Sequence, residues 1–188
     1  MRRTWKAASF GVVVGSLGGV YGGVGTVDAY VTNGCRWSGT NIYVKNAGGI
    51  SFYNGVTHNY QSYFNTAVSR WNGPVSDATW VMTPYTIKLS MENLNFGNNG
   101  KVGYSWWTCS GGTFDNYAVS SANEYYVWDE TGSEIAGLMV HELGHTAGLS
   151  HPNDCTDKGG NKAIMKSSFG CGFFSPQNDD VAGIHAIY

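Results

Sequence analysis

The sequence predicts a single α+β domain over residues 30–188, preceded by an export segment over residues 1–29. Two observations support this fold class. Some short segments alternate apolar and polar side chains as strands do, and others repeat apolar side chains every three to four residues as helices do. A third observation, a chain of 188 residues without repeats or a long linker, favours one domain.

The first residues have the pattern of a secretory signal peptide. Basic residues within positions 1–6 precede an uncharged stretch over residues 7–27, whose apolar centre is residues 10–14. Val27, Asp28 and Ala29 supply a cleavage site, and we expect cleavage after Ala29. The alternative is a membrane anchor, since the uncharged stretch could just span a bilayer, but its many glycines lower its hydrophobicity. We therefore predict a secreted, extracellular protein without stable membrane association.

Residues 41–45 form the first predicted strand, because Ile42 and Val44 alternate with Tyr43 and two glycines follow. Residues 60–71 form the first predicted helix. Its apolar side chains share one face of a 3.6-residue period and are Tyr60, Tyr63, Phe64, Ala67, Val68 and Trp71. The turn-forming residues 72–74 end this helix, and its aromatic face is assigned to the core.

Further strands are predicted in the middle of the chain. Residues 86–90 and residues 101–107 alternate as strands do, and the turn-rich residues 95–100 separate them. Residues 125–128 are another strand candidate.

Two more helices are predicted in the last third of the chain. Thr131 and Glu134 have the spacing of a capping box, in which each side chain bonds the backbone amide of the other residue. Apolar residues follow at helical spacing, and Gly148 is the expected end because glycine tolerates a left-handed turn. The last helix is predicted to start at Ser175 and Pro176, a cap residue followed by a proline.

The four cysteines all lie in the predicted secreted part: Cys35, Cys109, Cys155 and Cys171. An even number in an exported chain predicts two disulfides, for which three connectivities exist. We favour Cys155–Cys171, which closes a short loop and leaves Cys35–Cys109 as the other pair. No pair has the C-x-x-C spacing of a zinc knuckle, so we do not expect cysteine to bind metal.

The composition excludes two classes of protein. A chain that is 42% hydrophobic and 13% charged lacks the signature of disorder. Its net charge of -2 and pI near 6.2 provide no electrostatic reason to expect nucleic acid as a partner.

The segment HELGHTAGLSH over residues 141–151 fits the zinc-binding pattern H-E-x-x-H-x-x-G-x-x-H. His141 and His145 are four residues apart on a predicted helix, so both imidazoles project from one face and can bind one tetrahedral ion. Gly148 lets the chain turn out of the helix and bring His151 round as a third ligand. The expected ion is Zn²⁺, and three protein ligands leave its fourth position open for water.

Glu142 follows the first ligand and is the predicted catalytic base. It would take a proton from the zinc-bound water, whose pKa the metal lowers to about 7, and pass it to the departing amine of a cleaved peptide bond. Two alternatives are histidines that only pack or cap a helix, and a zinc site that is structural or inactive. The fixed residues would coincide by chance in about one chain in 10⁵ of this composition, which disfavours the first alternative.

On these residues the chain resembles the metzincin clan of zinc endopeptidases. Ile164 and Met165 stand where the clan has its Met-turn, whose methionine lies under the zinc site. Residues 175–184 are similar to the start of the C-terminal helix of the matrixins, where the Asp pair, here Asp179 and Asp180, sits under the Met-turn. The same pair would complement the dipole of that helix. The resemblance implies a twisted mixed β-sheet packed on two long helices, and a short C-terminal subdomain with the Met-turn and a final helix.

The chain departs from the matrixins at several positions. Pro152 follows the third histidine, as in the serralysins, but no glycine-aspartate calcium repeats follow it. Ser167 stands where serralysins and astacins have a tyrosine that binds zinc. A pro-segment with a zinc-blocking cysteine is not recognised, and Cys35 in that role would leave three cysteines to pair. We therefore predict a minimal, bacterial, matrixin-like metzincin.

The resemblance also implies where a substrate would bind. The strand before the zinc helix should pair with an extended substrate, and residues 101–107 are the candidate. Residues 166–171 should form the wall of the main specificity pocket. The aromatic residues Trp106, Trp107 and Phe169 are candidates for a subsite or for the core. Calcium is common among such relatives, but no D-x-D ligand run is visible, and His58 and His185 have no motif partner.

The predicted function is that of a secreted, monomeric zinc endopeptidase acting on proteins or peptides. Its rivals are a zinc enzyme that cuts cell-wall cross-links, a secreted binding module stabilised by zinc, and a membrane-tethered peptidase.

Overall fold

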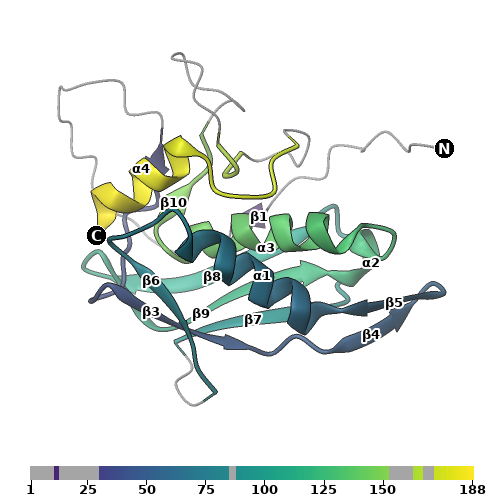
Figure 1. The fold of residues 1–188 in the computed structure, drawn as a ribbon. Helices are drawn as coiled ribbons and strands as arrows, with labels where there is room; N and C mark the ends of the chain where they lie inside the picture. Colours follow the sequence, from purple (N-terminus) through teal and green to yellow (C-terminus); the bar gives the residue numbers. More distant parts are fainter. Residues whose placement is uncertain (1–10, 13–29, 85–87, 153–162, 167–171) are drawn as a thin grey trace.

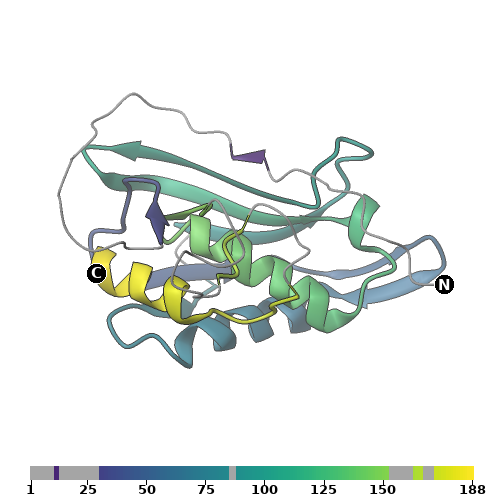
Figure 2. The ribbon, with the colours of Figure 1, turned by 90° about the horizontal axis from the view of Figure 1, so that it is seen from above.

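The computed structural model describes residues 11–12, 30–84, 88–152, 163–166 and 172–188. The predicted cleavage site and the predicted pair Cys155–Cys171 lie outside these ranges, as do Ser167 and Phe169. The described part has a mixed β-sheet with two helices packed against one face, which Figure 1 shows from the side and Figure 2 from above. No helix in these ranges is long and apolar enough to cross a membrane.

The central sheet has six strands in the order β1-β8-β9-β7-β3-β6. Their bounds are Gly11–Val12 (β1), Asn41–Asn46 (β3), Thr79–Met82 (β6), Leu89–Leu94 (β7), Gly103–Ser110 (β8) and Thr113–Asn123 (β9). All neighbouring pairs are parallel except β8 and β9, which are antiparallel. The predicted mixed sheet is therefore confirmed, and among the described residues the two-residue β1 is the neighbour of β8 on its outer side.

Two small sheets complete the strand pairing. The strands β4 (Ile50–Tyr53) and β5 (Val56–Asn59) form a hairpin, and its turn places Asn54 and Gly55 at φ of 50° and 83°. The short strands β2 (Val31–Thr32) and β10 (Leu149–Ser150) pair although they are far apart in the sequence. This second pairing ties the start of the domain to the segment just before His151.

The helices α1 (Tyr60–Asn72) and α3 (Gly132–His145) lie side by side on the sheet (Figures 1 and 2). The predicted apolar face of α1 is confirmed, because its buried residues are Tyr60, Phe64, Ala67, Val68 and Trp71. Trp71 joins the two helices, since its indole Nε1 donates a 2.9 Å hydrogen bond to the Val140 carbonyl. Its ring also stacks on Trp80 of β6, with ring centroids 5.0 Å apart, so helices and sheet share one core.

The short helix α2 (Glu124–Val127) corrects the strand predicted over residues 125–128. Asn123 ends β9 and caps this helix, because its side-chain oxygen accepts a hydrogen bond from the Tyr125 amide. The same side chain donates to the Gly97 and Lys101 carbonyls, and so organises the predicted turn segment between β7 and β8. Aromatic composition favoured a strand here, but the helix cap formed by Asn123 stabilises a helix instead.

Other boundaries differ from prediction by a few residues. The strand predicted over residues 86–90 is β7, which begins at Leu89, and the strand predicted over residues 101–107 is β8, which begins at Gly103. The last helix, α4 (Asn178–Ile187), is capped by Gln177 and not by Ser175. Asp180 explains this shift, because its carboxylate accepts the Gln177 amide at 2.7 Å and closes the first turn there.

Candidate metal centre and active site

The helix α3 carries two of the three histidines and begins as predicted. Thr131 caps it by accepting the Glu134 amide at 3.3 Å, and the Glu134 carboxylate accepts the Thr131 amide at 2.8 Å. Every residue from Ile135 to His145 is buried. The helix therefore crosses the interior, and any polar side chain on it must find its partners inside the protein.

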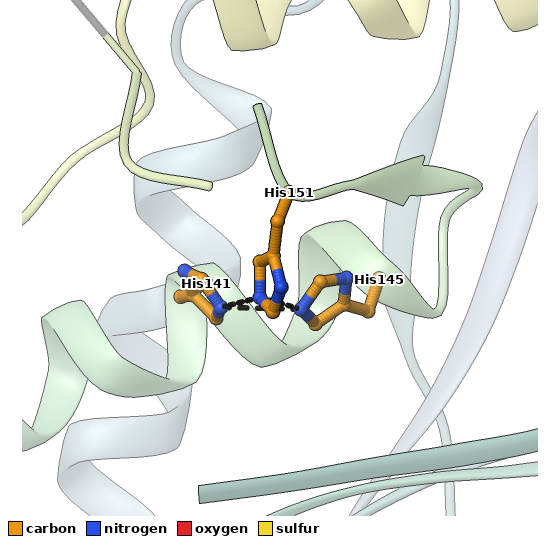
Figure 3. A group of neighbouring side chains, drawn as sticks. All are labelled: His141, His145 and His151. Carbon is orange, nitrogen blue, oxygen red and sulfur yellow. Dashed lines mark hydrogen bonds between the residues drawn. The ribbon is translucent and has the colours of Figure 1, made fainter. Parts of the chain in front are cut away.

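The three histidines converge on one point (Figure 3). The Nε2 atoms of His141 and His145 are 3.1 Å apart, and the Nε2 atom of His151 lies 3.0 Å from the first and 2.8 Å from the second. His141 and His145 are one helical turn apart on α3, and His151 follows β10. The structure therefore brings together all three residues that the motif predicts as ligands.

The other ring nitrogens fix the tautomers of the two helical histidines. His141 Nδ1 lies 2.7 Å from the Ile164 carbonyl, and His145 Nδ1 lies 3.0 Å from the Leu149 carbonyl. A carbonyl oxygen only accepts, so both Nδ1 atoms carry the proton and both Nε2 atoms present a lone pair. Lone pairs that face each other at 3.1 Å repel unless a cation lies between them.

Burial and mutual proximity keep these imidazoles neutral. Burial lowers the pKa of His145 to about 3 and that of His151 to about 4, with the neighbouring histidine adding to the effect at His145. Burial, together with His145 and His151, also holds the pKa of His141 well below its usual value. Neutral imidazoles are the form that binds metal ions, so this cluster is able to hold one.

Residues 146–151, here called the ligand loop, carry the chain from the end of α3 to the third histidine. Thr146 caps the helix, and Gly148 then adopts φ of +113°, a conformation that side chains rarely allow. A side chain at position 148 would also overlap the Cys35 carbonyl and the Ile187 side chain. Gly148 therefore acts as predicted in the turn, although the helix itself ends at His145.

Residues 31–37, here called the strap, bind the ligand loop from outside. The Asn33 side-chain amide donates to the His145 carbonyl at 2.8 Å, and the Asn33 backbone amide donates to the Gly148 carbonyl at 2.8 Å. The Trp37 indole Nε1 donates to the Thr146 carbonyl at 2.8 Å. The strap thus donates hydrogen bonds to carbonyls at and beyond the end of α3, where the regular helical hydrogen bonds stop.

The disulfide Cys35–Cys109 is present and joins the strap to β8. Its cysteines are 74 residues apart in sequence, with Cα atoms separated by 6.2 Å. On the same strand, Trp107 is buried and stacks on His145, with centroids 6.4 Å apart, whereas the Trp106 side chain is 40% exposed. Trp107 therefore belongs to the support of the histidines, and only Trp106 is open to solvent.

A turn at Ile164 and Met165 lies against the other side of the histidine cluster. Met165 is buried in contact with Gly144, where a side chain on residue 144 would overlap its sulfur. The Asp180 carboxylate accepts the Ile164 amide at 2.8 Å and the Met165 amide at 3.2 Å. Burial raises the pKa of Asp180 to about 6, against the effect of these hydrogen bonds.

Glu142 is buried beneath β8, with 1% of its surface exposed. The Ser105 hydroxyl donates to Glu142 Oε2 at 2.6 Å, while Oε1 has no hydrogen-bond partner among the described residues. Burial raises the pKa of Glu142 to about 8, and the bond from Ser105 opposes this rise. A carboxyl group with one free oxygen beside a histidine cluster is suited to proton transfer.

Several residues of the site could not be expected from the motif. Ser105, Asn33, Trp37 and Asp180 all contact the motif segment or its support across long sequence separations. Only Asp180 had a sequence signal, its position in the segment that resembles the matrixin C-terminal helix. The others are single polar or aromatic residues in strands and loops, where no spacing marks them.

Comparison with known proteins agrees with this geometry. The matrixin family profile of the M10 peptidases matches residues 76–188, more than half of the chain. Among solved structures, the GM1-bound form of the ECX AB5 holotoxin is similar with a TM-score of 0.55 and 15% identity, covering 79% of this chain and 80% of that one. At this identity the likeness concerns the fold alone. A search of curated proteins finds no match. From the family match and the histidine cluster we conclude that the chain belongs to the matrixin family of metallopeptidases.

Proposed function

We propose that this matrixin is a secreted zinc endopeptidase that hydrolyses peptide bonds within proteins. The observation that carries the proposal is the convergence of three neutral histidine Nε2 atoms. The helix α3, which carries two of these histidines, also carries the buried Glu142. The substrate is a protein or peptide chain, and we expect the enzyme to act as a monomer.

The donor set fits zinc. Ligand nitrogens about 2.0–2.1 Å from a tetrahedral zinc ion lie ~3.3 Å from one another, close to the separations of 2.8 to 3.1 Å among the three Nε2 atoms. The Nδ1 hydrogen bonds from His141 and His145 to backbone carbonyls are the usual outer partners of zinc-binding histidines. In the part of the chain that the structure describes, the cluster consists of three histidines, and three protein ligands with an open fourth position are the arrangement of catalytic sites.

The proposed chemistry divides between the metal and Glu142. Bound zinc would polarise the carbonyl of the scissile bond and lower the pKa of a water molecule. Glu142 takes the proton of the attacking water on its carboxylate and delivers it to the departing amine. Burial of Glu142 excludes bulk water from this transfer, and the hydrogen bond from Ser105 orients the carboxylate.

Two further features support the finer parts of the proposal. The turn at Ile164 and Met165, held by Asp180, supports the Met-turn that the resemblance implies. The oxidised pair Cys35–Cys109 favours export, because disulfides persist in extracellular compartments and are rare in the cytosol. Together with the signal-peptide pattern of residues 1–29, this supports a secreted enzyme.

The test compares wild-type protein with Glu142→Ala on casein and on purified peptidoglycan, each with and without a zinc chelator. We expect casein cleavage by the wild type alone, lost on chelation, while Glu142→Ala keeps its fold and its zinc. Cleavage of peptidoglycan alone would identify a cell-wall enzyme instead. Zinc binding without hydrolysis of any protein or peptide library would identify a binding module.

A further inference from the structure

We propose that Ser105 is a positioning residue that fixes the Glu142 carboxylate through one oxygen and leaves the other oxygen to transfer the proton. This inference rests on the proposed function, because it assigns how the catalytic glutamate is held. It concerns β8, a strand that contributes no residue to the zinc motif.

The contact between the two residues is short and buried. Ser105 Oγ lies 2.6 Å from Glu142 Oε2 and 2.9 Å from the Glu142 backbone carbonyl. Both side chains have 1% of their surface exposed. A distance of 2.6 Å is at the short end of the ordinary range for O–H···O hydrogen bonds, so the contact is well formed.

The strand geometry explains why position 105 can do this. Side chains alternate along β8, so Gly103, Ser105 and Trp107 face the helices, while Trp106 faces away and is 40% exposed. Ser105 is paired in register with Ser120 of β9, which fixes its position along the strand relative to the rest of the sheet. A buried hydroxyl is costly unless it is hydrogen-bonded, and the single hydrogen of the Ser105 hydroxyl has its nearest acceptor in Glu142 Oε2.

Gly103, on the same face of β8 as Ser105, leaves space for the Glu142 carboxylate. A side chain at position 103 would overlap Glu142 Oε1 and the Leu138 side chain, so only glycine leaves room for the acid where it lies. The carboxylate is therefore held between a hydroxyl that binds Oε2 and a glycine whose missing side chain makes space for Oε1.

The two oxygens consequently have different surroundings. Oε2 accepts the Ser105 hydroxyl, whereas Oε1 has no hydrogen-bond partner among the described residues although it is buried. A buried carboxylate oxygen without a partner is costly in a resting structure, but it is available to accept a proton from a reactant. Oε1 is therefore the oxygen that takes the proton, and Oε2 is the one that keeps the group in place.

The experiment uses the full-length, zinc-loaded protein and four variants. Ser105→Ala removes the hydroxyl, Ser105→Thr retains it, and Gly103→Ala displaces the carboxylate while Ser105 is intact. The matched control is Ser121→Ala, which removes an equally buried serine hydroxyl whose partner among the described residues is the Tyr104 carbonyl. Zinc affinity by chelator competition, the melting temperature, and the affinity for a peptide hydroxamate are measured beside kcat and KM.

We expect Ser105→Ala to lower kcat by ~10- to 100-fold with KM within ~2-fold, because a misplaced base affects the transition state and not substrate binding. Hydroxamate affinity should fall as well, since this inhibitor needs a carboxylate to accept its proton, and zinc affinity should stay unchanged. Ser105→Thr should keep kcat within ~3-fold of wild type, Gly103→Ala should lose kcat, and Ser121→Ala should not.

A kcat of Ser105→Ala within ~3-fold of wild type, while Glu142→Ala is inactive, would overturn the inference and leave the proposed function intact. Equal losses of kcat in Ser105→Ala and Ser121→Ala, or a loss of zinc affinity in Ser105→Ala, would also overturn it by making Ser105 structural. Activity in Glu142→Ala would instead contradict the proposed function itself. If Ser105→Ala does not fold, Ser105→Cys takes its place, because a thiol is a weak donor, and a kcat within ~3-fold of wild type in that variant would overturn the inference.

Discussion

The side-chain amide of Asn33 donates a 2.8 Å hydrogen bond to the carbonyl of His145, the second histidine of the metal cluster. The two residues are 112 positions apart in sequence. Around this bond, the strap and the C-terminal residue Tyr188 supply donors to the carbonyls of Thr146, Ala147 and Gly148. The path of the ligand loop, and with it the position of His151, therefore depends on segments outside the zinc motif.

Replacing Asn33 by alanine should weaken zinc binding and stability together. The variant removes this donor, while the Gly148 amide still donates to the His145 carbonyl, so the expected cost is that of a lost hydrogen bond, about 0.5–1.5 kcal/mol. We expect a similar loss in the free energy of unfolding by urea, and faster transfer of zinc to a chelator. Asn46→Ala is the control, since the Asn46 side chain makes three hydrogen bonds, to Gln61, Asn65 and Gly48, none of them to the ligand loop. Equal zinc affinity in wild type and Asn33→Ala would show that the strap does not hold the loop.

Removing the disulfide should have a related effect. Cys35–Cys109 closes a loop of 74 residues, which the chain-entropy model values at ~4 kcal/mol, and it fastens the strap to β8. The double variant Cys35→Ala/Cys109→Ala should therefore unfold at lower urea concentration and release zinc faster than wild type. Adding a thiol reductant to wild type should produce the same change and should affect the double variant less, since the double variant keeps only the predicted pair Cys155–Cys171. If the reductant lowered stability and sped up zinc release equally in both proteins, the change would come from other cysteines or from the metal and not from Cys35–Cys109.

The Asp180 carboxylate should be required for the turn at Ile164 and Met165. It accepts three backbone amides, from Ile164, Met165 and Gln177. In Asp180→Asn the amide nitrogen can accept none of them, so we expect a loss of about 1–3 kcal/mol in the free energy of unfolding. Because the Ile164 carbonyl contacts His141 Nδ1, zinc affinity should fall too. The exposed Asp77 provides the control variant Asp77→Asn, which should retain zinc affinity.

Glu130 should make the stability of the protein depend on pH. Burial raises its pKa to about 8, with contributions from Glu134 and Asp129, so the folded state favours the protonated acid. The stabilisation is complete below the unfolded pKa of about 4.5 and is lost as pH rises through about 8. Glu130→Gln imitates the protonated form. Its melting temperature should exceed that of wild type at pH 9 and match it at pH 5, and an equal difference at both pH values would contradict this assignment.

Local features of the chain were predictable because they depend on neighbours in sequence. The apolar face of α1 follows from the 3.6-residue period, and the capping box at Thr131 and Glu134 follows from their spacing of three. Where a residue had two local options, prediction was less successful. Residues 125–128 were predicted as a strand, but the cap by Asn123 starts the helix α2 there. Asp180 bonds the Gln177 amide, so α4 begins at Asn178 and not near Ser175.

The sequence by itself predicted the members of the metal cluster, because the spacing of four puts His141 and His145 on one face of a helix and the glycine after it lets the chain turn back with His151. Only the tertiary structure decided what supports the cluster. Ser105 reaches Glu142, and Asn33 reaches His145, through the pairing of strands and the packing of the strap. Such contacts join residues far apart in the chain by single hydrogen bonds, and no local period or spacing encodes them.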